Sequence, residues 1–151
     1  MGVQKVLLSV VFCLVFSVAA FAGPVAGTIN GKTFTFVAGS ASIQGNDVHV
    51  NLWTEAQANA CDGFSTSTLN ARAIFPAKVG KYEVVNGSFS ENVMIFGDNT
   101  TPGDPSNNIM ADHGTFEVTA ISDTALTGTL SGGLGFMNTE VSGEFSVPLC
   151  K

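Results

Sequence analysis

The sequence predicts a single all-β domain, folded as an antiparallel β-sandwich or flattened barrel of about eight or nine strands with mostly meander connections. Apolar residues recur at every second position through several short segments, which is the period of a half-buried strand. Turn-forming Asn and Gly residues separate these segments at intervals of about ten residues. No segment shows the three-to-four spacing of an amphipathic helix, and the 17 glycines would weaken a helical bundle.

The alternation defines the expected strands in chain order. It is clearest over 33–38, 47–54, 115–120 and 141–147, and weaker over 69–75, 81–85, 93–96 and 125–130. Asn30-Gly31 and Asn86-Gly87 predict two-residue hairpin turns, because Asn and Gly tolerate positive φ angles. Residues 45–47 predict a third turn and Gly132-Gly133 a fourth. Since short turns join these strands, we expect sequential strands to pair antiparallel.

Two segments do not alternate. Residues 55–68 are polar and rich in alanine, which indicates a long loop or a short helix. Residues 97–114 contain two prolines and several Asn and Asp residues, which indicates an irregular loop. Loops longer than about 12 residues are uncommon and are either functional or disordered, so the second segment is a candidate for function.

The first 22 residues have the pattern of a secretory signal peptide. Lys5 precedes an apolar run over 6–19, and Ala20-Phe21-Ala22 then gives the small-x-small pattern that signal peptidase reads. We expect cleavage between Ala22 and Gly23, which leaves 23–151 as a secreted or periplasmic domain with no stable membrane insertion. The alternative, a retained membrane anchor, would need about 20 apolar residues, and this run is shorter.

The charge of the domain excludes some partners. Lys5 is the only charged residue within 1–22, so residues 23–151 carry five basic and twelve acidic residues and a formal charge of −7. Nucleic-acid binding depends on Lys and Arg that neutralise phosphates, so we expect no nucleic-acid partner. An anionic membrane surface is disfavoured for the same reason.

Two cysteines, Cys61 and Cys150, remain after signal cleavage. In an oxidising compartment they predict one intrachain disulfide, and the alternative is two buried thiols. The bridge would close a loop of about 90 residues, which stabilises by roughly 4 kcal/mol in the chain-entropy model.

Catalytic and metal-binding patterns are missing from the sequence. Gly63-Phe64-Ser65 begins like a nucleophile elbow, but Ser67 stands where the final glycine belongs. Cys61 with His49 or His113 would make a nucleophile and base, but a structural bridge explains Cys61 better. The 97–114 segment gathers oxygen ligands suited to Ca²⁺, but it does not follow an EF-hand register. We therefore predict no catalytic residue, no metal site and no cofactor.

One strand carries the best candidates for ligand binding. Over 47–54 the apolar residues alternate with His49, Asn51 and Trp53, which must share the opposite face. An exposed Trp beside polar groups is common on binding surfaces. The alternative is that a second layer or a loop covers Trp53. We expect any contact with a protein or small-molecule ligand on this face or in the 97–114 loop.

The sequence also resembles a group of exported proteins. Gly27-Thr28-Ile29-Asn30-Gly31, Val79-Gly80-Lys81-Tyr82, 114–118 and 141–145 are similar to segments of small exported bacterial all-β proteins of unknown function, often lipoproteins. The resemblance implies a β-sandwich or barrel and no particular activity. The expected function is a non-enzymatic binding or structural module. The alternatives are a lipocalin-like barrel carrying a small apolar ligand, and a secreted hydrolase.

Overall fold

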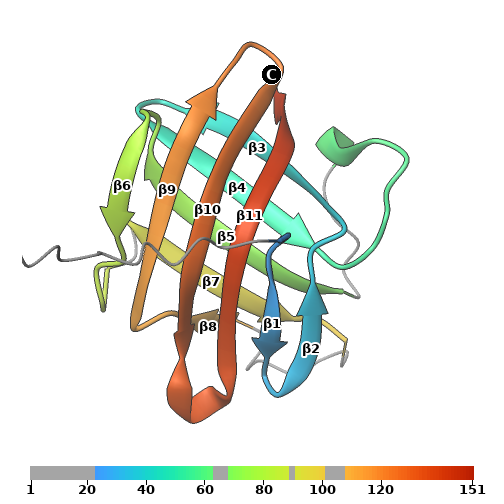
Figure 1. Ribbon diagram of the computed structural model, residues 1–151, viewed down its shortest axis with the longest axis vertical. Helices are drawn as coiled ribbons and strands as arrows, with labels where there is room; N and C mark the ends of the chain where they lie inside the picture. Colours follow the sequence, from blue (N-terminus) through green and yellow to red (C-terminus); the bar gives the residue numbers. More distant parts are fainter. Residues whose placement is uncertain (1–22, 63–67, 89–90, 101–107) are drawn as a thin grey trace, which may run out of the picture.

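The computed structural model describes residues 23–62, 68–88, 91–100 and 108–151. The predicted signal segment, including Ala22, lies outside the described residues, and Gly23 is the first residue inside them. The class is all-β, as predicted (Figure 1). The strands are β1 (Ala26–Ile29), β2 (Lys32–Thr35), β3 (Ala38–Gln44), β4 (Asp47–Trp53), β5 (Leu69–Pro76), β6 (Gly80–Glu83), β7 (Val93–Asp98), β8 (Asn108–Met110), β9 (His113–Ile121), β10 (Ala125–Leu134) and β11 (Thr139–Cys150), with short 3₁₀ helices η1 (Ala60–Asp62) and η3 (Gly135–Met137).

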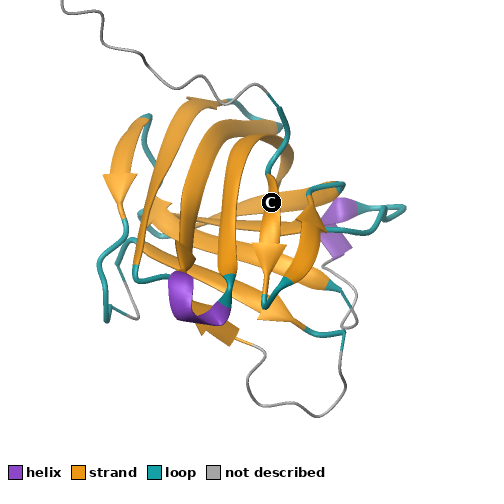
Figure 2. Cartoon of the chain, turned by 60° about the horizontal axis from the view of Figure 1, so that its bottom comes forward, coloured by secondary structure: helices purple, strands orange, loops and turns teal. Residues whose placement is uncertain are grey.

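The strands form one curled mixed sheet, a half-barrel (Figure 2). Their order is β6-β9-β10-β11-β3-β4-β5-β7-β8. Strands β1 and β2 attach beside β11. Figure 1 shows β6, β9, β10 and β11 crossing in front of β3, β4, β5 and β7. We call the strands β6, β9, β10 and β11 with β1 and β2 the first half, and β3, β4, β5, β7 and β8 the second half.

The pairing is not purely antiparallel, which corrects the sequence expectation. Strand β11 runs parallel to β3 through Leu149 and Cys150, and the other pairs among the described strands are antiparallel. The meander is also only partial, because β6 pairs with β9 and not with its neighbours in sequence. Short turns favour antiparallel neighbours, but β11 and β3 are far apart in the chain and no turn constrains their direction.

Strand β11 joins the two halves, because one of its edges pairs with two different strands along its length. Its beginning pairs with β1, and its end pairs with β3. Between them the N-terminal segment approaches closely, with the Glu144 amide donating to the Gly23 carbonyl oxygen at 2.9 Å. A Cβ atom on Gly143 would lie 2.7 Å from the backbone of Pro24, so only glycine permits this approach.

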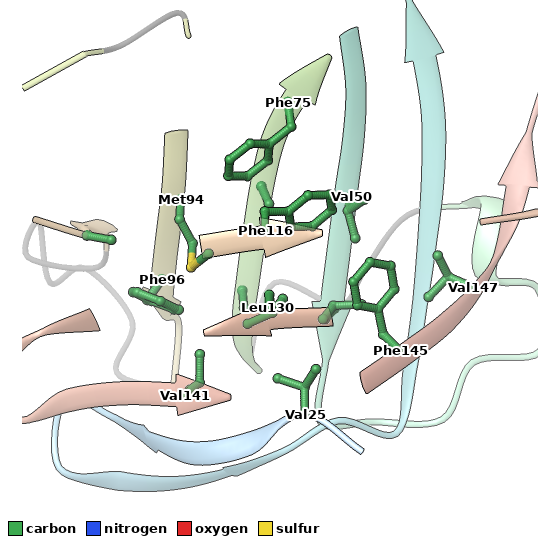
Figure 3. Packing of buried hydrophobic residues seen from close by; sticks show 14 of the residues in the cluster. Val25, Val50, Phe75, Met94, Phe96, Phe116, Leu130, Val141, Phe145 and Val147 are labelled. Carbon is green, nitrogen blue, oxygen red and sulfur yellow. The ribbon is translucent and has the colours of Figure 1, made fainter. Parts of the chain in front are cut away.

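The interior of the curled sheet is filled by apolar side chains from both halves (Figure 3). Phe75 of β5 stacks on Phe116 of β9 with ring centroids 4.3 Å apart, and Phe116 lies 5.5 Å from Phe145 of β11. All three rings are buried. Burying one such side chain stabilises the fold by roughly 1.5–3 kcal/mol, so this aromatic stack is a main link between the halves.

Two of the four predicted turns join paired strands, and a third is a turn but not the predicted hairpin. Asn30 and Gly31 both have positive φ angles, 52° and 73°, and join β1 to β2. Gly45, with φ 65°, begins the tight turn between β3 and β4. At Asn86-Gly87 only the glycine has a positive φ angle. This turn does not close a hairpin, because β6 and β7 do not pair with each other.

The fourth predicted turn, Gly132-Gly133, is wrong: both glycines lie inside β10. A Cβ atom at Gly132 would lie 2.7 Å from the His113 carbonyl oxygen, and one at Gly133 would lie 2.1 Å from the Thr139 carbonyl oxygen. The glycines therefore serve the close approach of neighbouring strands. The chain turns after them, through η3.

Both non-alternating segments contain regular structure within the described residues. Residues 55–68 contain η1, whose Cys61 forms the predicted disulfide with Cys150 at a Cα–Cα distance of 5.6 Å. Residues 97–114 are not one irregular loop, because β7 ends within them, β8 lies inside them and β9 begins at His113. Among the described residues, no helix is long and apolar enough to cross a membrane.

Candidate functional site

The candidate site is a small hollow on the outer face of β4, β5 and β7. Its volume is about 140 Å³. Register across the three strands builds it: Asn51 pairs with Arg72, Arg72 pairs with Ile95, and His49 pairs with Ile74. Directly paired residues lie on the same face of a sheet, so these five side chains surround one depression. We call it the β4–β5–β7 hollow.

His49 and Asn51 reach this hollow because β4 alternates strictly. Val48, Val50 and Leu52 are buried in the core, and His49 and Asn51 are half-buried on the opposite face. The sequence therefore placed these two candidate contacts on the correct face. Whether they bind a ligand stays a prediction.

Trp53 does not line the hollow, which corrects the third candidate contact. It lies on the same face of β4 by register, but its exposed fraction is 0%. Its neighbour across the strand pair, Asn70, is also buried, with 1% exposed. The outer face is thus covered at the Trp53–Asn70 row and open at the Asn51–Arg72 row. The burial of Trp53 agrees with the alternative expectation, in which a second layer or a loop covers this side chain.

Arg72 is the residue of the site that sequence reasoning missed. Its terminal nitrogen donates a hydrogen bond to the Asn108 Oδ1 atom of β8. Its Nε atom is buried and has no hydrogen-bond partner among the residues that the structure describes. No ion pair joins Arg72 to a carboxylate in the described part of the chain. The available signal was that Arg72 is the only charged residue within the predicted strand 69–75.

A larger hollow, of about 660 Å³, lies over β9, β10 and β11 beside Gly23 and Pro24. Its polar groups are threonines, Ser146 and Glu144, and Thr119 and Thr127 hydrogen-bond to each other at 3.1 Å. It contains no cationic side chain and no polar atom that is buried without a partner. Of the two hollows, we favour the smaller, because a buried donor in its lining, Arg72 Nε, lacks an acceptor among the described residues.

His113 lies between two carboxylates on the surface of the first half. Its Nδ1 atom is 2.6 Å from Asp112 Oδ1, and its Nε2 atom is 3.0 Å from Glu140 Oε2. The hydrogen bond with Asp112 raises the pKa of His113 above its ordinary value, partial burial opposes this, and the charge of Glu140 adds to the rise. Both ring nitrogens are engaged by acids, so neither faces a hydroxyl that it would activate.

Asp98 forms a buried polar cluster at the end of β7. It accepts hydrogen bonds from Lys32 Nζ at 2.7 Å, from Asn30 Nδ2 at 2.9 Å and from Thr100 Oγ1 at 2.6 Å. Burial alone would raise the pKa of Asp98, but these hydrogen bonds outweigh it and hold the pKa well below its usual range. The cluster ties the β1–β2 turn to β7, so its role is structural.

Three of the calcium candidates of 97–114 are engaged by other side chains of the domain. Asp98 pairs with Lys32, Asn108 with Arg72, and Asp112 with His113. The others include Asp104 and Asn107, which lie outside the described residues. No group of three or more His, Cys, Asp or Glu side chains within the described ranges is placed to hold a metal ion. Cys61 is held in its disulfide and is not a free nucleophile.

Comparison with protein-family models, with curated proteins and with solved structures finds no match to this chain.

Proposed function

We propose that this chain is an exported, non-enzymatic binding module whose ligand contacts the β4–β5–β7 hollow. The observation that carries the proposal is the cation without a counter-charge: Arg72 lies half-buried in the centre of a sheet face, beside His49 and Asn51, without a carboxylate partner in the described structure. A buried charged donor without an acceptor costs free energy, and a bound ligand would supply the acceptor.

Export is part of the same proposal. The pattern of residues 1–22 supports it, and so does the Cys61–Cys150 disulfide, because such bridges persist in oxidising compartments. Ligand sites commonly combine apolar walls with a few polar groups, and this hollow has Ile74 and Ile95 beside Asn51 and Arg72.

We also propose that the curled sheet is best described as a flattened barrel and not a sandwich. Strand β11 supports this description, because it pairs with strands of both halves. The lipocalin-like alternative has less support, since the rings of Phe75, Phe116 and Phe145 occupy the interior where an apolar ligand would lie. The hydrolase alternative has less support, since both nitrogens of His113 hold carboxylates.

Native mass spectrometry tests the binding proposal. Protein purified from the exported fraction of its host should carry a bound molecule or partner. The double variant His49→Ala/Asn51→Ala should lose it, whereas Thr127→Ala/Thr129→Ala, over the larger hollow, should keep it. Wild-type protein without any bound species, or loss in the threonine variant alone, would contradict the proposal.

A further inference from the structure

We infer that the β4–β5–β7 hollow binds a carboxylate group, with Arg72 as its main anchor. This inference rests on the proposed binding function and names the chemistry of the ligand. It begins from the hydrogen-bonding needs of the guanidinium group. An Arg side chain has five N–H donors in a fixed planar fork. Arg72 uses one toward Asn108, while its Nε donor is buried without an acceptor in the described structure.

The geometry of a guanidinium group selects its partner. Two parallel N–H groups match the two oxygens of a carboxylate, which is why Arg is favoured wherever carboxylates are recognised. In the described part of the chain no Asp or Glu takes this place, although acids outnumber basic residues twelve to five in 23–151. Among the described residues, this central cation therefore has no carboxylate partner.

The neighbours of Arg72 in the hollow include no Lys and no second Arg. Asn51, directly across the strand pair, offers an amide, and His49 lies two residues away on the same face. Ser40 of β3 pairs with Asn51 and adds a hydroxyl beside it. One guanidinium group beside amide and hydroxyl groups matches a single negative charge. A domain of net charge −7 would repel a dianion such as phosphate more strongly.

The walls of the hollow indicate what the carboxylate is attached to. Ile74 and Ile95 lie on the β5 and β7 sides of the depression and are half-buried. Drug-sized ligands fill pockets of roughly 300–1,000 Å³, so a hollow of about 140 Å³ holds a small molecule or one end of a larger ligand. We assign it to a carboxylate carried on a short branched apolar group. A small organic acid and the C-terminus of a peptide share this chemistry.

Nuclear magnetic resonance on ¹⁵N-labelled protein tests the inference with defined probes. Isobutyrate should shift the Arg72 Nε–H and Asn51 side-chain amide signals, whereas isobutyramide and inorganic phosphate should not. The dipeptide Gly-Val with a free C-terminus should act like isobutyrate, and its amidated form should not. A dipeptide that binds more than about tenfold more tightly than isobutyrate assigns the site to a chain end, and similar affinities assign it to a small acid.

Variants separate the guanidinium fork from charge alone. Arg72→Lys keeps the charge but not the fork, and both it and Arg72→Gln should weaken isobutyrate binding about tenfold or more. Lys81→Gln, an exposed basic residue of β6, is the matched control and should bind as the wild type does. The amide spectrum of each variant reports whether the fold is intact.

Three results would overturn the inference: equal shifts from isobutyramide, stronger binding of phosphate than of isobutyrate, or unchanged isobutyrate binding in Arg72→Lys. If no carboxylate probe binds while native mass spectrometry finds a neutral ligand that depends on His49 and Asn51, the inference fails and the binding proposal stands. If native mass spectrometry finds no ligand but isobutyrate binds through Arg72, the carboxylate inference stands and the proposed binding function fails.

Discussion

Replacing Asp98 by Asn should destabilise the domain by about 2–3 kcal/mol at neutral pH. The Asp98 side chain is 5% exposed, and Lys32 Nζ, Asn30 Nδ2 and two Thr100 donors converge on its two oxygens. Asparagine has the same shape as aspartate, but its side-chain NH₂ group is a donor and would face these donors in place of an acceptor oxygen. Removing one partner of a fully buried ion pair costs roughly 3–5 kcal/mol. Lys32 remains 43% exposed and can return to water, so the expected loss is smaller.

The pH dependence of this loss has a defined sign. The native pKa of Asp98 is held below its usual range, so the stabilisation is fully present above the unfolded-state pKa of about 3.9. It is lost as the pH falls below that value toward the native pKa. The stability difference between wild type and Asp98→Asn should therefore be constant from pH 7 to about 5 and narrow below about 4.

Urea unfolding followed by the fluorescence of Trp53, the single tryptophan, measures both effects. Asp123→Asn is the control, because Asp123 is exposed between β9 and β10 and its substitution should change stability by less than about 0.5 kcal/mol. The reasoning is refuted if Asp98→Asn costs less than about 1 kcal/mol at pH 7. It is also refuted if the difference in unfolding free energy between wild type and Asp98→Asn does not become smaller below about pH 4.

Three further predictions test other parts of the structure. Alkylation of the native protein should label neither Cys61 nor Cys150. Each single Ser variant and the double Ser variant should lose roughly 2–5 kcal/mol of unfolding free energy. If the loss in the double variant equals the sum of the two single losses, the two cysteines do not share one bridge. Trp53→Ala should cost roughly 3–5 kcal/mol in urea unfolding, and a loss below about 1 kcal/mol would contradict its burial. An NMR titration should place the pKa of His113 above the ordinary histidine value and find it lowered in Asp112→Asn; an unchanged midpoint would contradict the hydrogen bond.

Sequence periodicity located strands whose inner faces are apolar and failed where close packing requires small residues. Strand β4 was predicted with its buried face correct, because Val48, Val50 and Leu52 alternate with polar residues. Strand β3 was not predicted, because its inner positions are Gly39 and Ala41. A Cβ atom at Gly39 would lie 2.5 Å from the Asn51 carbonyl oxygen and 2.9 Å from Val147. The same closeness that makes β3 a central strand removes the hydrophobic signal from its sequence.

The strand order is determined by contacts that local patterns do not contain. The Asn30-Gly31 turn was predicted because it is decided by the φ angles of two adjacent residues. The parallel pairing of β11 with β3 depends on residues more than 100 positions apart, such as Leu149 and Ala41. Gly132-Gly133 shows the same limit, since a local turn signal was overridden by neighbouring strands that leave no room for side chains.

The candidate site was half predicted for a related reason. Alternation along one strand placed His49 and Asn51 on the outer face, but it cannot show which residue of the next strand lies beside them. Arg72 joins the site only through the register that pairs it with Asn51. A charged residue in an apolar strand is expensive to bury without a partner. That rule, applied to Arg72 before any register was known, would have made it a candidate.

Two neighbouring rows of paired residues differ in burial, and this difference explains the position of the candidate site. Asn51–Arg72–Ile95 and Trp53–Asn70–Gly97 cross the same three strands and face the same side, one pleat apart. The second row is closed: Trp53 and Asn70 are buried, and Asn70 lies so close to Gly97 that a Cβ atom there would be 2.4 Å away. The first row is open and holds the unmatched cation. Because a packed row borders it, we expect the backbone carrying Asn51 and Arg72 to move little, and a site ordered before binding loses less conformational entropy on binding.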